Sequence, residues 1–262
     1  MAEGVTVDID EEVARITLDR PEVRNALSAG MAAALGQAFQ EIQTTDARCV
    51  VIDGAGEAFC AGGDIEAMAE AQSRDVPPDE RVAMVRQSVN RAITAVWNCS
   101  LPVVAAVDGP VFGAGAGLML ACDIQLASMQ ARVGIGFRQV GLAVDSGVSA
   151  LLPRYVGPNV AKELVFTGEV LDADRARELG LFTRLFDDGE FETGVENMVE
   201  TIASGPTVAL SLSKQLLDQN HQSLEAALGE EARTQALAMD TADHTEGATA
   251  FLERRDPSFT GN

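Results

Sequence analysis

Ala105-Ala-Val-Asp-Gly-Pro-Val-Phe-Gly-Ala-Gly-Ala-Gly-Leu118 joins a predicted strand to a predicted helix, and this junction decides the fold class. The strand covers Val103–Val107, an apolar run that ends at the turn signal Asp108-Gly-Pro110. The helix covers Gly113–Ala121, which is apolar and built mostly from small residues. A buried strand that leads directly into a helix is typical of an α/β core.

Strands and helices continue on either side of this junction. Alternating apolar and polar residues predict a hairpin over Val5–Ile9 and Val13–Leu18, and Ser28 is placed to cap the following helix. Short apolar runs predict strands over Cys49–Ile52 and Ile124–Ala127. Helices are predicted over residues 81–97, 172–180, 206–219, 224–239 and 245–255. We therefore expect an α/β core over residues 1–200 and a C-terminal helical region over residues 201–262.

The chain is strongly acidic. It carries 40 acidic and 19 basic residues, for a formal charge of −21. Such a surface repels nucleic acid and anionic lipid, and there is no apolar run of about 18 residues to span a membrane, so we expect neither partner. Because the acids are spread along the chain, we expect adaptation to high intracellular salt. The alternative is an ordinary acidic surface.

Cysteine and histidine usage points away from disulfide and metal chemistry. None of the four cysteines lies in a C-x-x-C pair, which favours buried, apolar thiols in a reducing compartment. The two histidines, His221 and His244, do not favour a metal site. The N-terminus lacks the basic region and apolar run of a signal peptide, so we expect a cytoplasmic protein.

Three segments together resemble one known family. They are the stretch quoted above with Cys122-Asp123 after it, Leu18-Asp-Arg-Pro-Glu-Val-Arg-Asn-Ala-Leu-Ser28, and Gly54-Ala-Gly-Glu-Ala-Phe-Cys-Ala-Gly-Gly-Asp-Ile65. In this order and at ordinary spacing they resemble the crotonase (enoyl-CoA hydratase/isomerase) superfamily, and the resemblance spans roughly residues 5 to 261. It implies a spiral of ββα units followed by a helical trimerisation region, in a homotrimer or a dimer of trimers. It also implies an acyl-CoA thioester substrate and no cofactor besides the CoA that the substrate carries.

The resemblance places an oxyanion hole at the backbone N–H groups of Gly63 and Ala114. A thioester becomes reactive at its α-carbon when its carbonyl oxygen takes up negative charge, and one preorganised donor contributes about 3–4 kcal/mol. Ala114 begins a predicted helix, whose N-terminal dipole favours an anion. The alternative is that these small residues only shape turns.

Both glutamates of typical hydratases in this family are absent. Alignment with the family puts their positions at Gly117 and Phe137. One acid remains in the right segment, Asp145, where several isomerases of the family place an aspartate. Apolar neighbours would strengthen a single carboxylate as a base by desolvation, and a single base can move a proton from one carbon to another. The alternative is that Asp145 caps a helix starting at Ser146.

The pattern from Gly141 to Gly157 most resembles the 2-(1,2-epoxy-1,2-dihydrophenyl)acetyl-CoA isomerases of phenylacetate degradation, although Val144 replaces their usual proline. We therefore expect an acyl-CoA isomerase that shifts a double bond or rearranges a ring-epoxidised phenylacetyl-CoA. A hydratase of the same family and a non-catalytic acyl-CoA-binding protein remain open. A dehalogenase is disfavoured, because no histidine precedes His221 to activate the nucleophile.

The resemblance also assigns residues to CoA and substrate binding. Phe251 and Arg254 match an aromatic–basic spacing that binds CoA, often from a neighbouring subunit, and they would share one helical face. Arg24 is a further candidate for the CoA phosphates. The other residues assigned to binding are Ala26, Ala61, Asp64, Ile65 and Phe137.

The acidic composition generates a prediction about salt. If the chain is adapted to high salt, its melting temperature should rise as potassium chloride increases from about 0.1 M to about 3 M, because screening removes self-repulsion. Thermal melting followed by circular dichroism measures this. A flat or falling melting temperature would contradict the adaptation.

Overall fold

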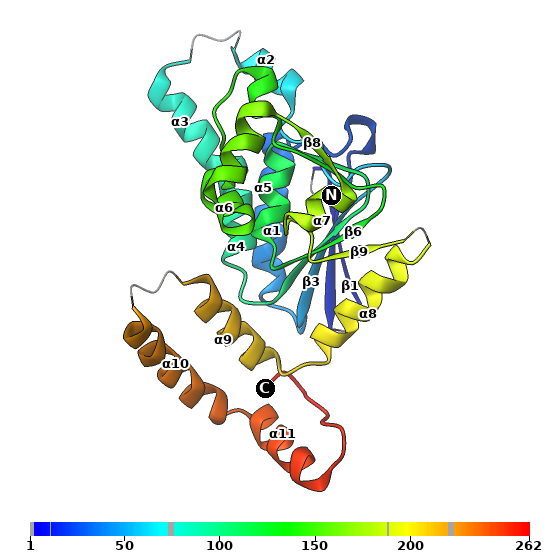
Figure 1. The fold of residues 1–262 in the computed structure, drawn as a ribbon, viewed down its shortest axis with the longest axis vertical. Helices are drawn as coiled ribbons and strands as arrows, with labels where there is room; N and C mark the ends of the chain where they lie inside the picture. The colour runs from blue at the N-terminus through cyan, green and yellow to red at the C-terminus, as the bar shows by residue number, and fades with distance from the viewer. Residues whose placement is uncertain (1–2, 11, 73–75, 188, 220–222) are drawn as a thin grey trace.

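The computed structural model describes residues 3–10, 12–72, 76–187, 189–219 and 223–262, and a six-stranded sheet forms its centre (Figure 1). The first two strands form the expected antiparallel hairpin, with Val5 opposite Leu18, and all later neighbours are parallel. The strands in spatial order are β1 (Val5–Asp10), β2 (Val13–Leu18), β3 (Cys49–Gly54), β4 (Val103–Val107), β6 (Ile124–Ser128) and β9 (Arg184–Phe186).

A smaller sheet runs beside the first and turns the chain into a spiral. It contains β5 (Pro110–Phe112), β7 (Arg132–Gly134) and β8 (Val170–Asp172). The chain passes from a strand of the large sheet to the small one and then into a helix: β4 and β5 lead to α5 (Ala114–Ala121), and β6 and β7 lead to α6 (Val148–Thr167). This order confirms the predicted α/β spiral of ββα units.

Helices cover both faces of the large sheet. In β3, Val50 and Ile52 pack into one apolar cluster and Cys49 and Val51 into another, because successive side chains point to opposite faces. The first cluster includes residues of α1 (Ala29–Ile42) and α4 (Val89–Trp97), and the second includes residues of α8 (Phe191–Ala203). The remaining helices are α2 (Ile65–Gln72), α3 (Pro78–Gln87), α7 (Ala173–Glu178), α9 (Thr207–Asp218), α10 (Leu224–Met239) and α11 (Ala242–Glu253), with 3₁₀ turns η1 (Pro21–Val23) and η2 (Gly136–Val140).

Two predicted helices differ from the structure. The helix expected over residues 81–97 is interrupted at Ser88, whose ψ of −107° is not helical. The Ser88 hydroxyl donates to the Met84 carbonyl at 2.7 Å, an example of serine competing with the helical backbone bonds. The helix expected from Thr245 begins earlier, because the Thr241 hydroxyl caps it by accepting from the His244 N–H.

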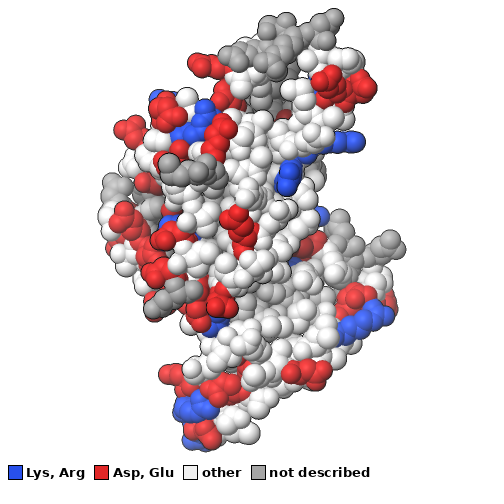
Figure 2. Space-filling model, turned by 180° about the vertical axis from the view of Figure 1, so that it is seen from behind, with Lys and Arg blue, Asp and Glu red and all other residues white. Residues whose placement is uncertain are grey.

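The four cysteines are buried and free, as expected from their sequence context. Burial raises the pKa of Cys49 and of Cys60 to about 12, so both thiols stay protonated at neutral pH. On the surface, acidic side chains are scattered over the face shown in Figure 2 rather than gathered in one segment. None of the helices in the described ranges is long and apolar enough to cross a bilayer.

One buried arginine connects the core to the C-terminal region. Arg48, at the edge of β3, is only 5% exposed. Its guanidinium donates to the Thr207 hydroxyl at the start of α9 (2.8 Å), to the Gly205 carbonyl and to the Phe259 carbonyl (3.3 Å), and it pairs with Glu12 (2.7 Å). The arginine therefore satisfies acceptors from the core, from the chain entering α9 and from the C-terminal tail.

A buried carboxylate on α11 also holds the C-terminal tail. Asp243, in the first turn of α11, accepts the backbone N–H groups of Thr260 (2.7 Å) and Gly261 (2.9 Å), and its own N–H donates to the Asn262 carbonyl. The tail thus returns to the core after α11 (Figure 1). The boundary expected at residue 200 falls within α8, whose Val195 and Val199 pack on the sheet.

We predict that Arg48→Ala lowers the free energy of unfolding by about 2 to 4 kcal/mol, because it leaves buried acceptors unpaired. The matched control is Arg175→Ala, because among the described residues the Arg175 side chain pairs only with Glu178, and both side chains are more than half exposed. That control should change stability by less than about 0.5 kcal/mol. Urea unfolding followed by Trp97 fluorescence measures both, and equal effects would contradict the role of Arg48.

Candidate active site

Two loops from consecutive turns of the spiral meet beside the small sheet. The Cys60 N–H donates to the Pro110 carbonyl (3.3 Å), and the Phe112 N–H donates to the Cys60 carbonyl (2.9 Å). Gly63 follows this pairing and lies just before α2, whereas Ala114 is the first residue of α5. Both residues therefore lie at or just before the N-terminal end of the helix of their unit.

The backbones of these loops approach too closely for a side chain between them. A Cβ added to Gly62, whose φ is +102°, would lie 2.9 Å from the Phe112 carbonyl oxygen and 3.6 Å from the Ala114 nitrogen. Within the described part of the chain, no acceptor pairs with the N–H of Gly63 or of Ala114. Two unpaired N–H donors at helix starts are suited to a developing negative charge.

Both donor residues line one cavity of about 330 Å³. Six of the residues assigned from sequence meet there: Ala61, Gly63, Ile65, Ala114, Phe137 and Asp145. The rest of the wall is mainly apolar, from Met68, Val89, Phe112, Val140, Leu142 and Val170, with Gln139. Two other hollows, of about 500 and 910 Å³, contain neither donor residue and not Asp145.

Asp145 is the titratable side chain of this cavity. It is half-buried between η2 and α6, and its Oδ1 accepts a hydrogen bond from the Ser146 hydroxyl at 2.7 Å. The helix-cap alternative is wrong: α6 begins at Val148, and the Val148 N–H donates to the backbone carbonyl of Asp145 rather than to its carboxylate. The carboxylate is therefore available to the cavity.

Neither of the two family glutamate positions supplies a carboxylate. Phe137 is almost fully buried and lines the cavity. Gly117 lies inside α5, where an added Cβ would lie 2.2 Å from the Ser146 carbonyl oxygen and 2.9 Å from the Ser146 Cβ. The turn after Asp145 thus occupies the space that a side chain at residue 117 would need.

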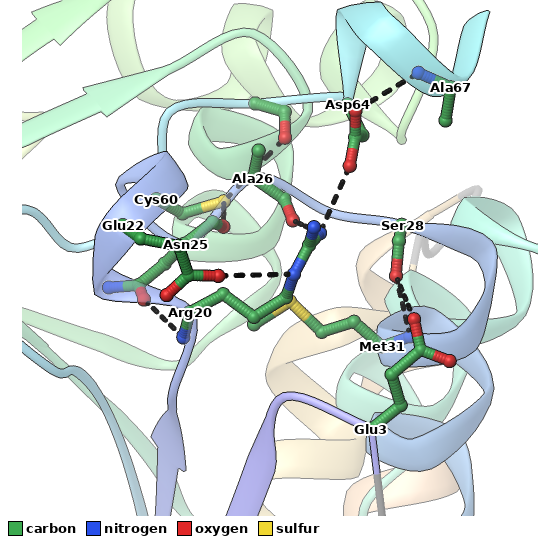
Figure 3. A network of polar contacts seen from close by, with 11 residues as sticks. Glu3, Arg20, Glu22, Asn25, Ala26, Ser28, Met31, Cys60, Asp64 and Ala67 are labelled. Carbon is green, nitrogen blue, oxygen red and sulfur yellow. Dashed lines mark hydrogen bonds and ion pairs between the residues drawn. The ribbon is translucent and has the colours of Figure 1, made fainter. Parts of the chain in front are cut away.

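A polar network holds the Gly63 loop in place (Figure 3). The Arg20 guanidinium donates to the Ala26 carbonyl (2.8 Å) and pairs with Asp64 (3.1 Å), and Asp64 also accepts the Ala67 N–H at the start of α2. The Ala67 hydrogen bond, with smaller contributions from Arg20, lowers the pKa of Asp64. Ala26 and Asp64 do not line the cavity, so in this chain they support the loop.

Sequence reasoning missed Asn25, although it lies in the first motif. It is fully buried with a positive φ of 58°. Its amide donates to the carbonyls of Ala55 (2.9 Å) and Ala58 (2.7 Å), and its side-chain oxygen accepts the Arg20 N–H. The signal was the asparagine itself, which is one of the few residues tolerated in left-handed backbone.

The three residues assigned to CoA binding lie outside the cavity. Arg24 is exposed, but its backbone carbonyl accepts the Ala61 N–H (2.9 Å), which places it directly behind the cavity wall. Phe251 is 83% exposed on α11, at the far end of the molecule from α2 (Figure 1). The shared helical face expected for Phe251 and Arg254 is wrong, because α11 ends at Glu253 and Arg254 adopts the left-handed conformation common at helix ends.

Comparison with known proteins agrees with this geometry. The family model described as enoyl-CoA hydratase/isomerase matches residues 8–262. A probable enoyl-CoA hydratase of Rhodobacter capsulatus is 36% identical over 259 residues, covering 98% of both chains. A 1,2-epoxyphenylacetyl-CoA isomerase of Escherichia coli is 33% identical over the full length of both. The crystal structure of an enoyl-CoA hydratase from Bacillus anthracis matches 99% of this chain and 100% of its own, with a TM-score of 0.91 at 30% identity. The chain therefore belongs to the enoyl-CoA hydratase/isomerase family, the crotonase superfamily that its motifs resemble.

Proposed function

We propose that this protein is an acyl-CoA isomerase with a single carboxylate base. The observation that carries the proposal is the composition of the cavity: among its described lining residues, Asp145 is the only titratable side chain, and it shares the cavity with the donors of Gly63 and Ala114. The thioester oxygen binds to the two N–H groups, and the acyl chain lies along the apolar wall.

The reaction moves one proton and one double bond. For a 3-enoyl-CoA, Asp145 removes a proton from C2, and the electron pair of that bond forms the enolate held by Gly63 and Ala114. When the enolate collapses, the double bond moves to C2–C3 and the C3–C4 π electrons take the same proton from Asp145 at C4. The product is a 2-enoyl-CoA, and no step needs a cofactor besides the substrate's CoA.

Two alternatives make different demands on the site. A hydratase must deliver water while a second group handles its proton, and the cavity offers one carboxylate for both tasks. A non-catalytic acyl-CoA-binding protein would use the same cavity without turnover. The names of relatives include both hydratases and an isomerase, so the carboxylate count is what favours the isomerase.

The CoA portion of the substrate requires residues outside the cavity. We propose that Arg24 contacts the CoA phosphates. Phe251 and Arg254 help to bind CoA across a subunit boundary, in a homotrimer or dimer of trimers. The exposure of Phe251 in a single chain supports this assignment. The aromatic wall residues Phe112 and Phe137 suit either an aliphatic chain or the ring of an epoxidised phenylacetyl-CoA.

We predict that Asp145→Asn lowers turnover of 3-enoyl-CoA by roughly 100-fold to 10,000-fold, because the amide keeps the shape but cannot accept the proton. Acyl-CoA binding should persist, because Gly63 and Ala114 are unchanged. Steady-state kinetics, with α-proton exchange in deuterium oxide, measures both. A loss within about threefold would mean that another base acts, since a lost general base costs far more.

A second prediction tests the closed space at residue 117. Gly117→Ala should destabilise the protein by about 1 to 3 kcal/mol through overpacking against Ser146. The matched control is Gly229→Ala, also inside a helix, where an added Cβ meets nothing within 4 Å. It should be neutral or stabilise by up to about 1 kcal/mol.

Gly117→Glu, which restores the family glutamate, should produce no hydration of crotonyl-CoA, because the carboxylate has no space beside Ser146. Chemical unfolding and a crotonyl-CoA hydration assay measure these outcomes. A folded Gly117→Glu protein that hydrates crotonyl-CoA would contradict the steric argument and favour the hydratase alternative.

A further inference from the structure

We propose that Ser146 is a positioning residue that holds one carboxylate oxygen of Asp145, so that the other oxygen alone exchanges the proton with the substrate. This inference rests on the proposed function of Asp145. It assigns a role to a side chain that is itself buried and does not line the cavity.

The hydrogen bond between the two residues is the first support. The Ser146 hydroxyl donates to Asp145 Oδ1 at 2.7 Å, and within the described residues it is the one hydrogen bond recorded for that carboxylate. The torsion that rotates a carboxylate is broad and has little intrinsic preference. A fixed donor on one oxygen therefore removes the main freedom of the base and leaves Oδ2 for the cavity.

The backbone of Ser146 is the second support. Its φ is +51°, and the residue is only 1% exposed. Left-handed backbone strains a non-glycine residue, and glycine would adopt this conformation without that strain. The other non-glycine residues with positive φ in the described ranges are Asn25 and the two helix C-caps, Arg24 and Arg254. Ser146 is not an asparagine and does not end a helix. What distinguishes serine from glycine at this position is its hydroxyl.

The surroundings fix the direction of that hydroxyl. The Ser146 carbonyl oxygen lies against Gly117 of α5, and the Val148 N–H donates to the Asp145 carbonyl at 2.9 Å on the other side. Gly147, with φ of 78°, completes the turn into α6. Because packing holds the turn from both sides, the serine donor is preorganised before substrate binds.

The test compares Ser146→Gly and Ser146→Ala, which both remove the hydroxyl but only one of which relieves the backbone strain. Both should lower kcat for 3-enoyl-CoA by about 10- to 100-fold while KM changes less than about twofold, since a misplaced base costs rate and not binding. Ser146→Gly should melt at or above the wild-type temperature, and Ser146→Ala should not. A loss of kcat without a loss of stability is a result that a purely structural role does not give.

A double-mutant cycle separates this inference from the proposed function. If Ser146 acts through Asp145, Ser146→Gly should cause no further loss in an Asp145→Asn background. Full kcat in Ser146→Gly, or an equal loss in both backgrounds, would overturn the positioning role even if Asp145 is the base. If Asp145→Asn itself leaves turnover intact, it is the proposed function that fails.

Discussion

The close approach of backbones between consecutive turns of the spiral is the constraint on which the rest depends. The backbone of Cys60 bonds to Pro110 and Phe112. Gly62 can lie close to the Phe112 carbonyl and the Ala114 nitrogen because it has no side chain to separate the two loops. The bridge between Cys60 and Val111 joins the first loop to the edge of the small sheet, just before α5 begins. It also brings the N–H groups of Gly63 and Ala114 to one cavity. Larger residues would separate the loops, and the two N–H groups would no longer lie at one cavity.

The fold and half of the site could be predicted from the sequence, and the reasons differ by residue. The hairpin has clear periodicity, the buried strands are short apolar runs, and the Ser28 cap has a local signal; the structure confirmed all three. The break at Ser88 depends on a local bond to the Met84 carbonyl, which a serine inside a predicted helix indicates only weakly. The bonds of Arg48 could not be predicted, because Arg48 and Thr207 are 159 residues apart in the sequence and meet only in three dimensions. The same holds for Asp64: its carboxylate is occupied by Ala67 and Arg20, a pairing across 44 residues from Arg20 that no local pattern indicates.

The glycine at residue 117 and the turn that follows Asp145 form one structural feature. Gly117 allows the Asp145–Ser146 turn to pack against α5, and that turn in turn leaves no space for a carboxylate at residue 117. A carboxylate at residue 117 would therefore require a coordinated change of helix and loop. A single substitution at either position would leave an overpacked or an incomplete site.

The main-chain origin of the two donors has a consequence for how this site tolerates sequence change. A side chain introduced at Gly63 would meet only the flexible end of Met68, whereas one at Gly62 would meet the Phe112 backbone. Mutational scanning would thus report the donor itself as permissive and its neighbour as essential. Apart from proline, no replacement at residue 63 removes the backbone N–H. Residue 63 can therefore change during evolution while its hydrogen-bond donor stays in the cavity.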